Sequence, residues 1–78
     1  MKIAVKVLPR EEVLDSQGRA VEKTLEHNNM AVDHCRIGKY IVLDFSEDDV
    51  TKAKEKATEI ANSLLHNPLI EQFELEVL

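Results

Sequence analysis

Hydrophobic and polar residues alternate at the start of the chain. Between residues 2 and 8, Ile3, Val5 and Val7 are separated by charged or small residues. This period of two is typical of a β-strand with one buried face. Pro9 then interrupts the pattern, because proline has no backbone N–H to give to a sheet. We therefore expect a first strand over residues 2–8.

Three later stretches show the same alternation. Residues 32–37 and 40–45 flank Gly38 and Lys39, and a glycine in the first central position suits a type II′ hairpin turn. Near the C-terminus, Phe73, Leu75 and Val77 alternate with polar residues. The sequence thus predicts a hairpin in the middle of the chain and a last strand at its end.

Two other stretches carry apolar residues at helical spacing. From Gln17 onward one such stripe runs to Leu25, with Asp15 as a suitable N-cap and asparagines at residues 28 and 29 as a stop. A second stripe runs from Val50 to Leu65, after a serine and three acidic residues at 46–49 that suit a helix start. The sequence therefore predicts two amphipathic helices.

The expected order is βαββαβ, which indicates one α+β domain spanning residues 1–78. Such a chain forms a ferredoxin-like antiparallel sheet with both helices on one face. The other face and the strand edges are left open. Because 78 residues provide only a small core, we expect the protein to oligomerise through its sheet.

The composition excludes several partners. The formal charge is -5, so neither nucleic acid nor an anionic membrane is expected as the main partner. The single cysteine excludes an internal disulfide, and no Cys/His cluster has zinc-ligand spacing. With no signal peptide or membrane-spanning run expected, the predicted compartment is the cytoplasm.

The sequence offers little chemistry of its own. Cys35 and His34 are neighbours in an expected strand and would point to opposite faces. His34 is therefore not placed to act as a general base for the Cys35 thiol. The two glycines lie in different elements, so no phosphate-binding loop is present. We therefore expect no catalytic, cofactor-binding or metal-binding residue in this chain.

Two places remain as candidates for contact with other subunits. Gly18 lies in the first turn of a helix, where glycine costs about 0.5–1 kcal/mol relative to alanine. Either another part of the same chain crosses closely there or a partner protein lies on the turn. The second place is the expected hairpin turn, for which a simple solvated turn is the alternative. The candidate contact residues are Leu14, Asp15, Gln17, Gly18, Arg36, Gly38, Lys39 and Tyr40.

Three motifs carry a family resemblance. They are Val-Leu-Asp-Ser-Gln-Gly at 13–18, Arg-Ile-Gly-Lys-Tyr at 36–40 and Leu-Leu-His-Asn-Pro-Leu-Ile-Glu at 64–71. In this order and spacing they resemble the PurS family, the small subunit of multi-subunit phosphoribosylformylglycinamidine (FGAM) synthase. The family commonly has proline in place of Ser16 and alanine in place of His66. The first departure affects the rigidity of the helix start, and the second is a change at a helix end.

The resemblance implies a role in de novo purine synthesis. The complex of this family converts formylglycinamide ribonucleotide, ATP and glutamine to formylglycinamidine ribonucleotide. A glutaminase subunit (PurQ) and a synthetase subunit (PurL) carry the chemistry, and ATP and magnesium are used there rather than in the small subunit. PurS-like dimers, or dimers of dimers, dock between the two and help ammonia to pass from one site to the other.

Two other functions are compatible with the same order of elements. A stand-alone regulatory domain of the ACT kind would bind an amino acid or another small ligand at a dimer interface. A metal-carrying ferredoxin-like domain is disfavoured because the chain has no CxxC motif.

Overall fold

β1 (Lys2–Pro9) is the central strand of the sheet in the computed structural model, which describes residues 1–78. β2 (Lys39–Asp44) and β3 (Glu71–Val77) flank β1, and both pairings are antiparallel. The strand order β2-β1-β3 leaves β2 and β3 as the two edges of the sheet. The expected α+β class with an antiparallel sheet is therefore confirmed.

The helices are α1 (Ser16–His27), between β1 and β2, and α2 (Val50–Ile60), between β2 and β3. A π-helical turn, η1 (Ala61–Leu65), continues α2 before the chain turns into β3. Asp49 is the N-cap of α2, and its carboxylate accepts a hydrogen bond from the N–H of Thr51 at 2.9 Å. The helix thus begins after Asp49, the last of the four residues at 46–49, rather than directly after Ser46.

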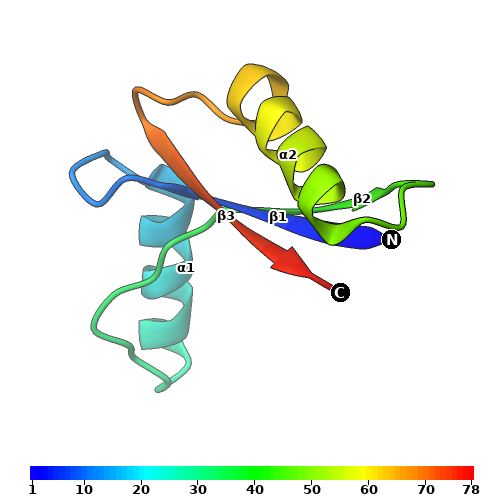
Figure 1. The fold of residues 1–78 in the computed structure, drawn as a ribbon. Coiled ribbons are helices and arrows are strands. Elements are labelled where there is room, and N and C mark those ends of the chain that lie inside the picture. Colours follow the sequence, from blue (N-terminus) through cyan, green and yellow to red (C-terminus); the bar gives the residue numbers. More distant parts are fainter.

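The core lies between α2 and one face of the sheet. Ile3, Val5 and Val7 are fully buried on that face, as the alternation in β1 predicts. The helix side supplies alanines spaced by four residues, which lie on one stripe and let the backbone approach the sheet closely. These buried alanines are Ala53, Ala57 and Ala61. Figure 1 shows α2 lying across β1 and β3 on this side.

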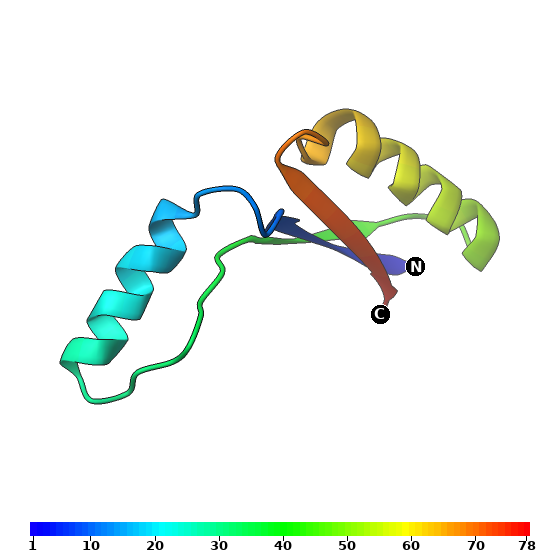
Figure 2. The same cartoon turned by 90° about the vertical axis from the view of Figure 1, so that its left-hand side faces the viewer.

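α1 stands away from the sheet. Figure 2 shows it as an arm, joined by a loop from β1 and by an extended segment that returns to β2. Gly18 is its only buried residue. The radius of gyration is 15.5 Å, whereas a compact domain of this length has about 11–12 Å. The expectation that both helices cover one face of the sheet was therefore wrong for the single chain.

The expected strand over residues 32–37 is also absent. The chain runs on from this segment directly into β2, with no hairpin between them. Gly38 does not have the positive φ that a type II′ turn requires. Instead, a Cβ at this position would overlap the carbonyl oxygen of Val7. Gly38 is needed because the chain crosses closely over the end of β1.

Candidate subunit-contact site

The start of α1 is tied to the extended segment by one carboxylate. Asp15 is the N-cap, and its Oδ1 accepts a hydrogen bond from the N–H of Gly18 at 2.9 Å. Its Oδ2 accepts a second one from the N–H of Ile37, also at 2.9 Å. The bond from Gly18, followed by that from Ile37, holds the pKa of the Asp15 carboxyl below its ordinary value.

Glu22, further along α1, also binds the backbone of the extended segment. Glu22 Oε2 accepts a hydrogen bond from Arg19 Nε at 2.9 Å and another from the N–H of Cys35 at 3.0 Å. The bond from Arg19, and then that from Cys35, lowers the pKa of the Glu22 carboxyl. Arg19 also donates to the carbonyl oxygen of Cys35 at 2.9 Å. The backbone of Cys35 is thus bound through both of its polar groups.

Asp15, Arg19 and Glu22 form one stripe along α1, because residues four and seven apart lie on the same side of a helix. Asp15 was expected as the N-cap from the sequence, whereas Arg19 and Glu22 were not among the candidate contact residues. The signal in the sequence that indicates these two residues is their spacing from Asp15, which places all three on one side of the helix. We call these three residues, with residues 34–37, the arm clasp.

Gly18 is where the arm clasp is tightest. A Cβ there would overlap the carbonyl oxygen of Cys35 and the carboxylate of Asp15. Of the two explanations offered by the sequence, the structure thus provides the close crossing within the same chain. The helix turn accepts glycine because the backbone of the returning segment occupies the space of a side chain.

The other candidates divide into engaged and exposed side chains. The Arg36 guanidinium donates to the carbonyl oxygen of Pro9, and Lys39 Nζ lies 3.3 Å from the carbonyl oxygen of Leu65. Lys39 is also 3.8 Å from the carboxylate of Glu71. By contrast, Leu14, Gln17 and Tyr40 are exposed. The structure brings the helix start and the segment around residue 37 together, and leaves these three side chains free for contact.

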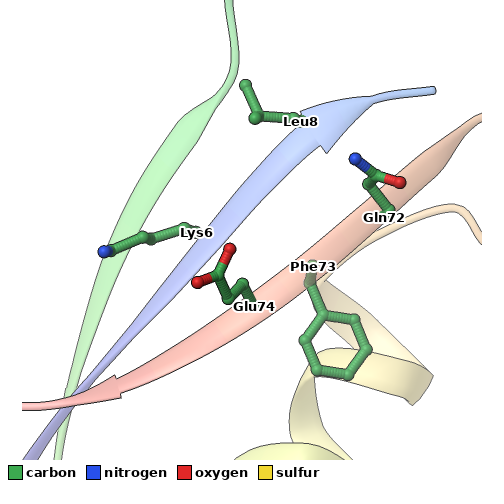
Figure 3. A pocket seen from close by; sticks show the side chains of 5 residues that line it. All are labelled: Lys6, Leu8, Gln72, Phe73 and Glu74. Carbon is green, nitrogen blue, oxygen red and sulfur yellow. The ribbon is translucent and has the colours of Figure 1, made fainter. Parts of the chain in front are cut away.

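A small pocket lies on the sheet face that α2 does not cover. It is lined by Lys6, Leu8, Gln72, Phe73 and Glu74. Figure 3 shows Phe73 pointing away from the other four, toward the helix. The ammonium group of Lys6 is 2.7 Å from Glu76, and the hydrogen bond to Glu76 raises the Lys6 pKa. An exposed lysine in an ion pair is a weak general base, so this pocket offers no catalytic set.

The remaining chemistry is limited. Cys35 is a free thiol, half-buried and outside the core. The structure holds no group of three His, Cys, Asp or Glu side chains arranged for a metal ion. It likewise has no helix of the length and hydrophobicity needed to cross a bilayer. The polar side chains of the site therefore bind backbone segments of the same chain. The exposed side chains beside them form a surface that another protein can contact.

Comparison with known proteins gives a consistent result over the whole chain. The family described as PurS: Phosphoribosylformylglycinamidine (FGAM) synthase matches residues 2–78. The FGAM synthase subunit PurS of Thermotoga maritima is 33% identical over 78 residues, covering 99% of this chain and 95% of the relative.

Solved structures agree with this match. The crystal structure of the PurS subunit from Thermotoga maritima has a TM-score of 0.93 at 33% identity and covers 99% of this chain and 90% of that one. A chain of the PurLQS structure from the same organism has a TM-score of 0.90 at 32% identity, over 99% and 95% of the two chains. This chain belongs to the PurS family of FGAM synthase subunits.

Proposed function

We propose that this chain is the non-catalytic subunit that joins a glutaminase subunit (PurQ) to a synthetase subunit (PurL) in purine biosynthesis. In this role it supports the passage of glutamine-derived ammonia to the synthetase site. The observation that carries the proposal is the match to a chain of the PurLQS structure, which covers 99% of this chain and 95% of that one. A match of this extent favours assembly with larger subunits over a stand-alone ligand-binding domain of the ACT kind.

The shape of the chain supports the same role. The arm formed by α1 and the loops at its two ends exposes apolar side chains that no part of the chain covers. Leu14 is 78% exposed, Met30 67% and Val32 48%. These side chains lie at the two ends of α1, so both ends of the projecting arm offer apolar surface to another protein. The arm is therefore the part of the chain that we assign to contact with the larger subunits.

The chemistry of the proposal lies outside this chain. ATP and magnesium would be used by the larger subunits, and this subunit would bind neither. The complex would work in the cytoplasm. The arm clasp fits this division, because its carboxylates and its guanidinium are occupied by backbone groups of the same chain.

A reconstitution experiment tests the proposal. The two larger subunits are mixed with formylglycinamide ribonucleotide, ATP and magnesium, with and without this chain, and the product is measured. With glutamine as nitrogen donor, we expect synthesis to depend on this chain. With an ammonium salt as donor, we expect synthesis without it, since ammonia then reaches the synthetase directly.

The two nitrogen donors serve as matched controls for each other. A role in ammonia transfer predicts loss of glutamine-dependent synthesis alone, whereas a role in synthetase folding predicts loss of both. Equal use of glutamine with and without this chain would contradict the proposal. Glutaminase or ATPase activity of the purified chain by itself would also contradict it.

A further inference from the structure

The loop between η1 and β3 contains a turn that is held by its own hydrogen bonds. The carbonyl oxygen of Asn67 accepts a bond from the N–H of Ile70 at 3.1 Å, and its side-chain Oδ1 accepts one from the N–H of Leu69 at 3.0 Å. Asparagine in the first position and Pro68 in the second favour a β-turn of type I, and no residue of the turn has the positive φ that type II requires. We call residues 67–70 the proline turn.

Arg10, the residue that follows β1, holds the proline turn from outside. Its backbone N–H donates to the carbonyl oxygen of Ile70 at 2.8 Å. Its guanidinium donates twice to the carbonyl oxygen of Pro68, from Nε at 3.1 Å and from Nη2 at 3.0 Å. These three hydrogen bonds fix the proline turn to the start of the loop between β1 and α1.

The proline turn is ordered, yet it leaves apolar side chains in solvent. Leu69 is 84% exposed, more than any other large apolar side chain of the chain, and Ile70 is 45% exposed. Fixing an exposed loop costs conformational entropy, and in the single chain Leu69 gains no burial that offsets this cost. A side chain displayed on an already ordered turn loses little further entropy when another protein covers it. The proline turn is therefore preorganised for binding.

The charges beside the proline turn indicate the chemistry of a partner. Glu11 and Glu12 follow Arg10 in the chain, are exposed and form no ion pair. Arg10 and Arg36 are half-buried, and their guanidinium groups donate to backbone carbonyl oxygens. The exposed charge at this place is therefore negative. An apolar tip beside exposed carboxylates is complementary to an apolar pocket bordered by basic side chains.

A subunit that joins two larger subunits needs two separate contact surfaces, and this step rests on the function proposed above. The arm provides one such surface. Figure 2 shows the proline turn, in orange, beside the end of α2 and away from the arm. The two surfaces lie on different parts of the chain, so each can meet a different neighbour.

We propose that Leu69 inserts into an apolar pocket, bordered by basic side chains, on one of the two larger subunits, while the arm contacts the other. Ile70 adds apolar surface beside the inserted side chain. Arg10 is a positioning residue in this contact, because it holds the proline turn in the shape that displays Leu69. The occupied pocket excludes water from Leu69, which supplies the burial that the single chain lacks.

A photo-cross-linker on the proline turn tests the contact. In a Cys35→Ser background, Leu69→Cys is labelled with benzophenone maleimide, mixed with both larger subunits under the conditions of the synthesis assay, and irradiated. Electrophoresis and mass spectrometry identify the adduct. We expect the label at residue 69 to attach to one larger subunit, and the same label on Leu14→Cys to attach to the other. Leu64→Cys is the matched control, since Leu64 is 79% exposed and outside the proline turn.

Three outcomes of this cross-linking would overturn the proposal. The first is attachment of the labels at residues 69 and 14 to the same larger subunit. The second is an adduct from residue 69 with a second copy of this chain alone. The third is no more attachment from residue 69 than from residue 64.

Substitution gives an independent measurement. Leu69→Asp places a charge that must be desolvated in the apolar pocket. We expect this variant to require at least about tenfold more protein for half-maximal glutamine-dependent synthesis, as for a binding hot spot. Leu64→Asp should match the wild-type chain, with circular dichroism confirming that both variants fold. Equal requirements for the two variants would overturn the proposal.

Arg10→Met tests the positioning role, because it removes the guanidinium and leaves Leu69 in place. Amide protection at Ile70 should fall, and the protein required for half-maximal synthesis should rise by about threefold or more, since the turn must then be ordered on binding. Arg10→Lys can still donate to Pro68 and should have a smaller effect. Lower protection at Ile70 with an unchanged requirement would contradict the positioning role.

The wild-type chain separates this proposal from the function on which it rests. If the wild-type chain does not restore glutamine-dependent synthesis, the proposed function fails and the contact fails with it. If it restores synthesis while Leu69→Asp and Leu64→Asp behave alike, the proposed function stands and only the role of the proline turn is overturned.

Discussion

The Oδ2 atom of Asp15 lies 2.9 Å from the backbone nitrogen of Ile37, while its Oδ1 caps α1 through Gly18. One carboxylate therefore joins the start of the helix to a segment 22 residues further along the chain. Because α1 stands away from the sheet, this bond and the bond that Glu22 accepts from Cys35 help to hold the helix against residues 34–37. Loss of charge at these two residues should release the arm while the sheet stays folded.

Acid pH should loosen the arm clasp. The pKa values of Asp15 and Glu22 lie below their ordinary 3.8 and 4.5. Carboxyls with lowered pKa values in the folded state contribute stability above their ordinary pKa, and this stability is lost as pH falls through the lowered values. Protection factors for amide exchange at Cys35 and Ile37 should therefore decrease below about pH 4.

The control for this titration is the double variant Asp15→Asn with Glu22→Gln. Its amide protection at Cys35 and Ile37 should be low at every pH, because the charged acceptors are gone. The amide of Val5, in the central strand, serves as an internal reference and should keep its protection in both proteins. Protection at Ile37 that is independent of pH would show that Asp15 does not hold the arm.

Gly18→Ala should destabilise the protein by about 1–3 kcal/mol, as overpacking of a filled site does. Alanine is a better helix former than glycine by about 1 kcal/mol, so the intrinsic effect has the opposite sign. The overlap with the backbone of Cys35 decides the outcome. Chemical denaturation measures the free energy of unfolding. Gln17→Ala, at the preceding and exposed position, is the control. A stabilised Gly18→Ala variant would show that the segment moves aside at little cost.

The elements with strict periodicity were predictable from the sequence. The alternation around Val5 placed β1, and the apolar stripe around Ala57 placed α2, because a buried face imposes its period on the side chains. The sequence did not predict that residues 32–37 stay outside the sheet and are bound by side chains at α1. A period of two indicates an extended segment with one apolar side, but it does not say which strand, or which chain, lies beside it.

The candidate site was predicted in part, for the same reason. Asp15 was identified from its capping position, which is a local property. Glu22 was not, since its acceptor role depends on a segment that returns 13 residues later. Gly38 was given the wrong role because glycine serves equally for a turn and for a close crossing. Only the position of Val7 decides between the two.

Ala57→Leu tests the close approach of α2 to the sheet. Ala57 is fully buried against Ile3, so three added carbons have no free space. We expect a loss of about 1–3 kcal/mol in the free energy of unfolding. Thr58→Leu, at the next and exposed position, is the control and should change stability by less than about 0.5 kcal/mol. A neutral Ala57→Leu would mean that α2 is free to move away from β1.

Leu14→Asp should weaken assembly with the larger subunits without unfolding the chain. The side chain is 78% exposed beside the helix start, and a charge placed in an apolar contact must be desolvated on binding. Leu64→Asp is the matched control, at 79% exposure and outside the candidate contact residues. We expect glutamine-dependent synthesis at limiting subunit concentration to require about thirtyfold more Leu14→Asp protein, as for a binding hot spot, and little more of the control. Equal effects of the two variants, at equal melting temperatures, would place the contact elsewhere than at the start of α1.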